Sequence, residues 1–197
     1  LQDFLSCSMA RDYVDEDISL AQTLHSDYYT DKELFERIKE SFLNHWHFAV
    51  HSSEFDSVNI IPLERMGDII NDEVILTKDE NYACISNVCT HRAMLLVEEK
   101  CKKSRIQCPY HGRTFDLQGQ FKNMPKFENV KNFPTHKDNL EKFQLMNWKN
   151  LLFVNKGEQN FDEFIEFLDN RIGWMDIEKF KYDSGKDPTY SVKANWA

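Results

Sequence analysis

Two short pairs of residues, each made of one cysteine and one histidine, constrain the folding of this chain more than any other feature. Cys89 and His91 form the first pair and Cys108 and His111 the second, with sixteen residues between His91 and Cys108. For a chain with five cysteines and seven histidines among 197 residues, chance produces this pattern on the order of one time in ten thousand. We therefore expect a fold in which two separate loops meet at one metal-binding site.

Two kinds of metal site use two cysteines and two histidines. Zinc takes such a set tetrahedrally, but its sites usually place cysteine near cysteine and histidine near histidine along the chain. A Rieske [2Fe-2S] cluster takes two thiolates on one iron and two imidazoles on the other. The mixed pairs favour the cluster, with Cys89, His91, Cys108 and His111 as its metal ligands. A zinc site remains the alternative, and we expect no catalytic residue in the chain.

The residues around these ligands resemble the Rieske domain of the large subunit of ring-hydroxylating non-haem iron oxygenases. The resemblance lies in residues 86–92 (SNVCTHR), residues 108–116 (CPYHGRTFD), Gly119 and Met124-Pro125. It extends less specifically to residues 28–31 and to residues 194–196, which resemble the segment before the Rieske domain and the entry into the catalytic domain.

Two positions depart from the family pattern, and neither is a ligand. Ala93 stands where glycine commonly follows the His-Arg pair, and Arg113 stands where many members carry tryptophan. Arg92 and Arg113 flank the ligand loops. They could tune the cluster or take part in docking, or they could simply pair with surface carboxylates.

Short runs rich in β-forming residues, separated by turn residues, predict a mainly β, antiparallel fold. The resemblance implies a Rieske iron–sulfur β-sandwich or barrel with flanking helices, and the start of an α+β catalytic domain at the C-terminal end. The residues between the ligand pairs fit a hairpin with residues 99–104 at its tip. The expected strands are 46–50, 58–63, 73–77, 82–86, 95–98, 105–107, 114–117, 140–146 and 151–154.

Helical spacing of apolar residues appears twice. Thr30 and Glu33 form a capping box, and the apolar residues after them predict a helix from about 31 to 45. A second apolar stripe predicts a helix over 161–172. Residues 190–196 alternate as a strand would.

We expect three regions: an N-terminal arm and helix (1–45), the Rieske domain (46–157) and the beginning of a truncated catalytic domain (158–197). Alternation that still runs at Ala197, together with Leu1 in place of methionine, leads us to expect a fragment cut at both ends.

Composition narrows the choice of partners and location. A net charge of −9 disfavours nucleic acid. No run of eighteen apolar residues and no secretory signal is present in the sequence, so we expect neither a membrane span nor export but a cytoplasmic protein. The remaining cysteines show no pairing pattern and fit a reducing compartment. His45, His47 and His51 are a weaker candidate metal cluster.

The resemblance implies a function that the chain shares with a longer protein. A reductase or ferredoxin would reduce the cluster, and the electron would pass to a mononuclear Fe(II), expected only in the missing C-terminal domain, where dioxygen hydroxylates an organic substrate. Such monooxygenases and dioxygenases are homo-oligomers built on trimers. The alternative is a free-standing Rieske ferredoxin-type electron carrier, to which both helices and residues 194–196 would be superfluous.

Overall fold

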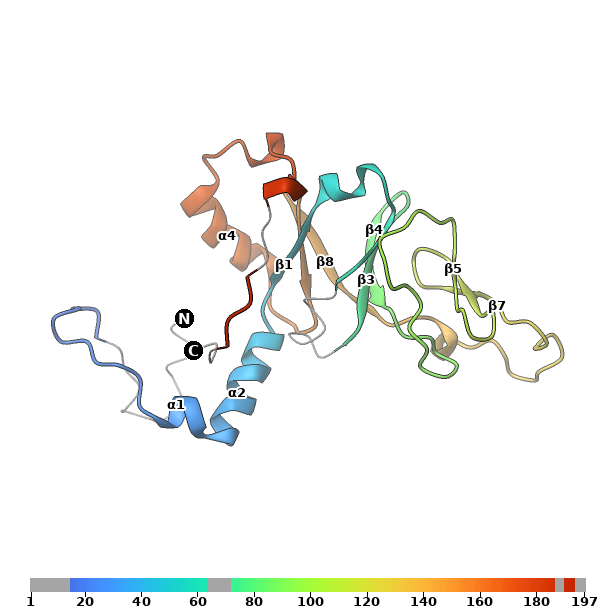
Figure 1. Ribbon diagram of the computed structural model, residues 1–197, viewed down its shortest axis with the longest axis horizontal. Helices are drawn as coiled ribbons and strands as arrows, with labels where there is room; N and C mark the ends of the chain where they lie inside the picture. The colour runs from blue at the N-terminus through green and yellow to red at the C-terminus, as the bar shows by residue number, and fades with distance from the viewer. Residues whose placement is uncertain (1–14, 64–71, 187–189, 194–197) are drawn as a thin grey trace. The chain divides into compact units, whose positions relative to one another are not determined.

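The computed structural model describes residues 15–63, 72–186 and 190–193 (Figure 1). The chain divides into two compact units. One comprises Phe42–Asp187, and the other comprises Leu1–Ser41 with Pro188–Ala197. All four candidate cluster ligands belong to the first of these units.

Two helices, α1 (Asp27–Thr30) and α2 (Lys32–Leu43), begin the regular structure, and α2 confirms the helix expected after residue 31. The capping box is wrong, however. The Asp31 carboxylate accepts the Leu34 N–H at 2.9 Å, whereas the Thr30 hydroxyl donates to the Ser26 carbonyl at 3.2 Å. Thr30 is the last residue of α1, so its hydroxyl is used within that helix, and the extended Asp31 caps α2 instead.

Nine strands form two antiparallel sheets in the part of the chain that the structure describes, which confirms the mainly β fold. The larger sheet has six strands in the order β1-β9-β8-β4-β3-β2, and the smaller has three in the order β5-β6-β7. The strands are β1 (His47–His51), β2 (Ile60–Pro62), β3 (Val74–Lys78), β4 (Tyr82–Ser86), β5 (Ile106–Gln107), β6 (Thr114–Phe115), β7 (Phe121–Asn123), β8 (Lys142–Trp148) and β9 (Leu151–Asn155).

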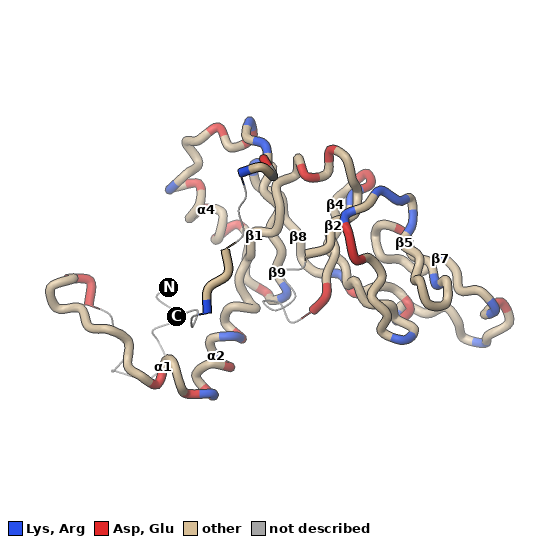
Figure 2. The backbone as a smooth tube through the Cα atoms, viewed as in Figure 1, with Lys and Arg blue, Asp and Glu red and all other residues tan. Residues whose placement is uncertain are grey.

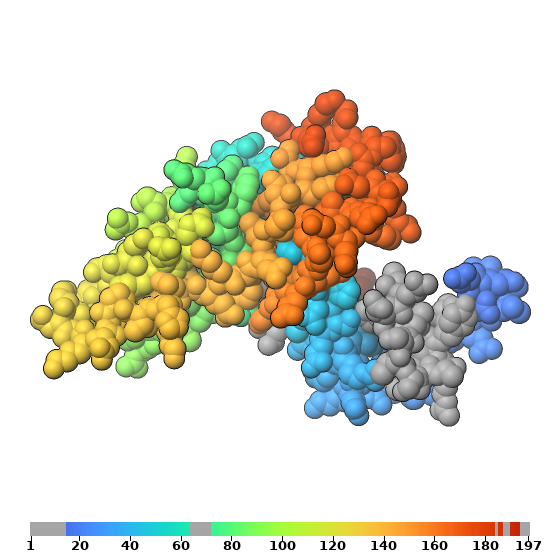
Figure 3. Space-filling model, turned by 180° about the vertical axis from the view of Figure 1, so that it is seen from behind, coloured from blue at the N-terminus to red at the C-terminus, as the bar shows by residue number. Residues whose placement is uncertain are grey.

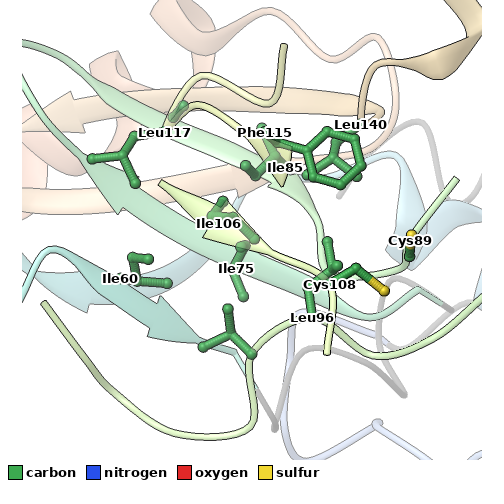
Figure 4. Packing of buried hydrophobic residues seen from close by; sticks show 12 residues of the cluster. Ile60, Ile75, Ile85, Cys89, Leu96, Ile106, Cys108, Phe115, Leu117 and Leu140 are labelled. Carbon is green, nitrogen blue, oxygen red and sulfur yellow. The ribbon is translucent and has the colours of Figure 1, made fainter. Parts of the chain in front are cut away.

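Both faces of the β2–β3–β4 part of the larger sheet are buried. Along β3, Ile75 faces a core that includes Ile106 and Phe115 of the smaller sheet, while Leu76 faces a second core with Val154. Neighbouring residues of a strand point to opposite faces, so a strand covered on both sides is apolar throughout. In Figure 4, Cys89 and Cys108 lie at one end of the first core. The ligand loops are therefore anchored in packed side chains.

Helix α4 (Phe161–Ile172) confirms the second predicted helix. Asn160 caps it by accepting the Asp162 N–H at 2.8 Å. Its apolar stripe packs with Trp46 and Phe153 in a third core, and Figure 3 shows the residues of α4 against those of β8 and β9. That residues 158–197 begin a catalytic domain stays a prediction.

The remaining described helices are short 3-10 helices of three to five residues. They are η2 (Ser52–Asp56), η3 (His136–Asp138), η4 (Ile177–Lys179) and η5 (Ser184–Lys186). The η3 turn borders the ligand loops through contacts described below.

The predicted hairpin between the ligand pairs is wrong. Residues 95–98 form no strand: Leu95 makes one isolated bridge with Val88, and Cys101 makes another with Ile60. Strand β5 instead pairs with β6, which follows it in sequence. The prediction failed because a short apolar run can be buried without pairing as a strand.

Two further segments differ from the strands expected from the sequence. Strand β7 was not predicted, because its three residues, of which only the first is apolar, show no alternation that sequence inspection could detect. Residues 190–193 form no strand, and residues 194–196 lie outside the described residues.

Candidate functional site

The first ligand loop follows β4 and is closed by its own backbone. The Cys89 N–H donates to the Met94 carbonyl at 2.8 Å, and the Cys89 carbonyl accepts the Ala93 N–H at 3.0 Å. Ala93 has a φ of 51°, a left-handed conformation that costs a residue with a Cβ about 1 kcal/mol. The structure therefore explains why glycine commonly stands at this position in the family.

The second loop, between β5 and β6, repeats the same pattern. The Cys108 N–H donates to the Arg113 carbonyl at 2.7 Å, and the Cys108 carbonyl accepts the Gly112 N–H at 3.0 Å. Gly112 has a φ of 74°, and a Cβ there would lie 3.3 Å from Cγ of Pro125. Each loop thus presents a cysteine at its base and a histidine at its tip.

The structure brings all four predicted ligands together. Cys89 and Cys108 are buried, at 2% and 3% exposure, and both belong to the same hydrophobic core, where Cys108 helps to raise the pKa of Cys89. The ring centroids of His91 and His111 are 4.8 Å apart, with an angle of 74° between the rings. The two thiols therefore lie in one core and the two imidazole rings lie against each other, as a cluster with two differently ligated irons requires.

The state of these groups also suits iron. Nδ1 of His91 is buried and has no hydrogen-bond partner, so it is available as a ligand atom. Burial, together with His111, Arg113 and Arg92, lowers the pKa of His91, which favours the neutral imidazole that coordinates metals. Burial raises the pKa of Cys89, although the backbone N–H of His91 opposes that shift, so cluster binding has to displace the thiol proton.

The arrangement fits a two-iron cluster better than one zinc ion. Within the described residues, no three His, Cys, Asp or Glu side chains converge so that they could hold a single ion. Tetrahedral zinc would need four such groups around one point. Each iron of a Rieske cluster takes only two protein ligands, because the bridging sulfides complete its coordination. That these four residues bind the cluster stays a prediction, tested below.

Each imidazole also contacts one aromatic side chain. The Tyr110 ring lies on that of His111, with centroids 3.7 Å apart, and the Phe127 ring meets His91 edge-on at 6.0 Å. His111 itself is exposed. Aromatic rings therefore pack against both imidazoles, while the tip of the second ligand loop reaches the surface.

The other candidate residues have different outcomes. The three histidines near β1 do not form a metal site: Nε2 of His47 bonds the Phe42 carbonyl at 2.7 Å, and Nδ1 of His51 bonds the Ser53 hydroxyl at 2.8 Å. Arg92 is exposed.

Arg113, in contrast, is buried and joins Thr90 of the first ligand loop to Asp138 of η3. The sequence places Arg113 beside the ligand loops, but no motif marks Thr90 or Asp138 as its partners. Asp138 lies 27 residues beyond His111, the nearest of the four ligands in the chain, and no regular spacing connects the two.

The sequence carries a net charge of −9, and it predicts no segment that would span a membrane. Acidic and basic residues lie intermixed along the Phe42–Asp187 unit in Figure 2. None of the helices in the described ranges combines the length and apolar character that a membrane span requires.

Comparisons with known proteins agree with the geometry. The model of the Rieske [2Fe-2S] domain family matches residues 45–134. The carnitine monooxygenase oxygenase subunit of Escherichia coli (strain K12) is 34% identical over 139 residues, which are 68% of this chain and 36% of the relative. The chloroplastic choline monooxygenase of Arabidopsis thaliana is 26% identical over 192 residues, covering 89% of this chain and 44% of the relative. The chain thus spans less than half the length of these two relatives.

Solved structures show the same relationship. The quaternary ammonium Rieske monooxygenase CntA, in complex with an inhibitor, matches with a TM-score of 0.67 and 26% identity, over 82% of this chain and 46% of that chain. A naphthalene 1,2-dioxygenase variant matches with a TM-score of 0.61 and 22% identity, over 72% of this chain and 33% of that one, which shows the fold alone. The chain therefore belongs to the Rieske non-haem iron oxygenases and carries their Rieske [2Fe-2S] domain.

Proposed function

We propose that this chain is the electron-transfer portion of an oxygenase component and that it binds a [2Fe-2S] cluster through Cys89, His91, Cys108 and His111. The observation that carries the proposal is the meeting of the two ligand loops, with both cysteines in one core and the imidazole centroids 4.8 Å apart. When bound, such a cluster accepts and releases one electron at a time.

The residues of the chain position and protect that site. The two buried cysteines belong to the core beneath the loops, so the sulfur side of the site is kept from water. The exposed His111 and the Tyr110 ring tilted against it offer a surface for electron entry or exit. Burial around the cysteines also favours close, dry packing of a compact cluster.

The partners follow from the family. A reductase or ferredoxin would supply electrons to the cluster, and a mononuclear Fe(II), held by a further domain of the longer protein, would supply the dioxygen chemistry. One solved CntA structure is described as giving insight into inter-subunit electron transfer. That description supports a homo-oligomer, built on trimers, in which the electron crosses between subunits.

The substrate class to test first is a quaternary ammonium compound. Relatives named for carnitine and for choline match this chain, and both substrates carry that group. The cytoplasm suits the proposed role, because its reducing conditions disfavour disulfides, and no disulfide joins the four cysteines of the described residues.

Reconstitution tests the ligand assignment. The chain is incubated anaerobically with iron and sulfide, then analysed for both elements and by electron paramagnetic resonance after reduction. We expect equal iron and sulfide and a rhombic signal with a low average g value. Cys108→Ser and His111→Ala should lose the cluster, because each removes one ligand from an iron that has only two from the protein.

Matched controls distinguish ligands from neighbours. Cys101→Ser changes a free cysteine and His136→Ala an exposed histidine, and both variants should keep full iron and sulfide. Wild-type protein that binds zinc but no sulfide would refute the proposal. Full cluster content in Cys108→Ser with loss in Cys101→Ser would refute the ligand set.

A further inference from the structure

Arg113 is a buried cation next to the ligand loops. Its exposure is only 3%, although arginine is rarely buried because removing its charge from water is costly. The guanidinium carbon lies 5.3 Å from the ring centroid of Phe121 and 5.5 Å from that of Phe133. The site therefore holds a positive charge in an apolar, aromatic surrounding, where charges interact more strongly than in water.

The polar contacts of Arg113 join three segments. Nη1 donates to the Thr90 hydroxyl at 2.6 Å, and Thr90 lies between the ligands Cys89 and His91. Nη2 donates to the Asp138 carboxylate at 3.1 Å, and the Thr90 hydroxyl donates to the Asp138 carbonyl at 2.9 Å. The side chain thus ties the first ligand loop to η3.

The backbone of the same residue closes the other loop. Arg113 lies two residues after His111 in the chain, and its carbonyl accepts the Cys108 N–H at 2.7 Å. Asp138 is in turn fixed by Thr135, whose N–H and hydroxyl donate to its other carboxylate oxygen at 2.7 and 3.1 Å. One residue therefore links both ligand loops to a rigid turn. Nε of Arg113 is buried and has no hydrogen-bond partner. Among the ion pairs of the described residues, Asp138 is the only carboxylate that pairs with the Arg113 guanidinium.

We propose that Arg113 is a positioning residue that locks the two ligand loops together, and that its buried charge raises the reduction potential of the cluster. The inference rests on the proposed function, because it takes the cluster as bound. Reduction adds one negative charge to the cluster, and a nearby cation in a region of low dielectric constant stabilises the reduced form.

Two variants with opposite charge effects test the electrostatic part. Arg113→Gln removes the cation, so the equilibrium constant for one-electron reduction should fall about tenfold, which corresponds to about 59 mV. Asp138→Asn removes the anion and leaves the cation unbalanced, so the potential should rise. The double variant should lie between the two single variants. A residue that only supported the fold would not shift the potential in opposite directions in the two single variants.

A charge-matched control excludes a general effect of net charge. Lys179 and Asp176 form an exposed ion pair at 2.5 Å, and Lys179→Gln removes one positive charge, as Arg113→Gln does. Its potential should equal that of the wild type, because an exposed charge is screened by water and salt.

Arg113→Lys tests the locking part. It keeps the charge but cannot reach Thr90 and Asp138 with two separate donors, so the potential should stay near the wild-type value while the cluster-free protein melts at a lower temperature. An unchanged melting temperature would overturn the locking role.

Potentials that move in the same direction, or not at all, in cluster-loaded Arg113→Gln and Asp138→Asn would overturn the electrostatic role, while the proposed function would stand. Wild-type protein without iron and sulfide would instead defeat the proposed function itself.

Discussion

The side chain of Asn87 substitutes for a missing strand pairing, and its replacement gives a sharp test of the fold. Asn87 is 2% exposed and lies two residues before the ligand Cys89. Its Nδ2 donates to the Val97 carbonyl at 2.7 Å, and its Oδ1 accepts the Val97 N–H at 2.9 Å. The perturbation is Asn87→Ala, which removes both bonds and leaves the backbone of Val97 buried.

The same chain contains an exposed counterpart of this arrangement. Nδ2 of Asn59 donates to the Lys103 carbonyl at 2.9 Å, and its Oδ1 accepts the Lys103 N–H at 2.9 Å. Lys103 is exposed, so water can replace the lost partner there. Asn59→Ala is therefore a matched control with two bonds of nearly the same length.

The expected magnitudes follow from burial. A buried donor or acceptor left without a partner costs about 1–3 kcal/mol, and Asn87→Ala leaves one of each, for a total of about 3 kcal/mol. Asn59→Ala should cost about 1 kcal/mol, because its backbone partners become hydrated. The difference between the two variants should be about 2 kcal/mol.

Urea unfolding of the cluster-free protein, followed by circular dichroism at neutral pH, measures both changes. The slopes must match that of the wild type for the free energies of unfolding to be compared. Equal losses in the two variants, or a larger loss in Asn59→Ala, would contradict the reasoning that burial determines the cost.

Two further predictions concern a turn and a buried thiol. Gly119→Ala should lower the free energy of unfolding by about 1–2 kcal/mol, because Gly119 has a φ of 78° and a Cβ would lie 3.2 Å from Cγ2 of Ile85 and Cβ of Leu140; an unchanged melting temperature would count against the turn as described. Burial, with a smaller contribution from Asp72, raises the pKa of Cys84 from 9.0 to about 12. The thiol therefore contributes stability below pH 9 that is lost as pH rises toward 12. The stability advantage of wild type over Cys84→Ala should shrink by about 1.4 kcal/mol per pH unit in that window, and an advantage that stayed constant would argue against the shift.

Most of the secondary structure was predictable because it is recorded in local spacing. The apolar stripe of residues 161–172 follows from the period of 3.6 that burial of one helix face imposes. The strands of the larger sheet that are buried on both faces are short β-rich runs bounded by turn residues. The predicted hairpin between the ligand pairs is wrong because local spacing does not show which groups satisfy a buried backbone. Residues 95–98 have an apolar run, but the Asn87 side chain satisfies Val97, so no second strand is needed.

The candidate site was predictable only in part. Metal ligands require particular residue types, so Cys89, His91, Cys108 and His111 could be named from their spacing, and the structure brings them together. The link from Arg113 through Thr90 to Asp138 could not be named, because any hydroxyl or carboxylate in the chain offers the same chemistry and only the fold selects which one is near.

The sequence by itself determined the kind of chemistry and the antiparallel β class, since both depend on residue type and on short-range pattern. Tertiary structure alone decided which loop conformations hold the ligands, with Ala93 and Gly112 at matching left-handed positions, and which buried groups surround them. Those features arise from contacts between residues far apart in the chain, and the energies of such contacts depend on burial and geometry that no local spacing encodes.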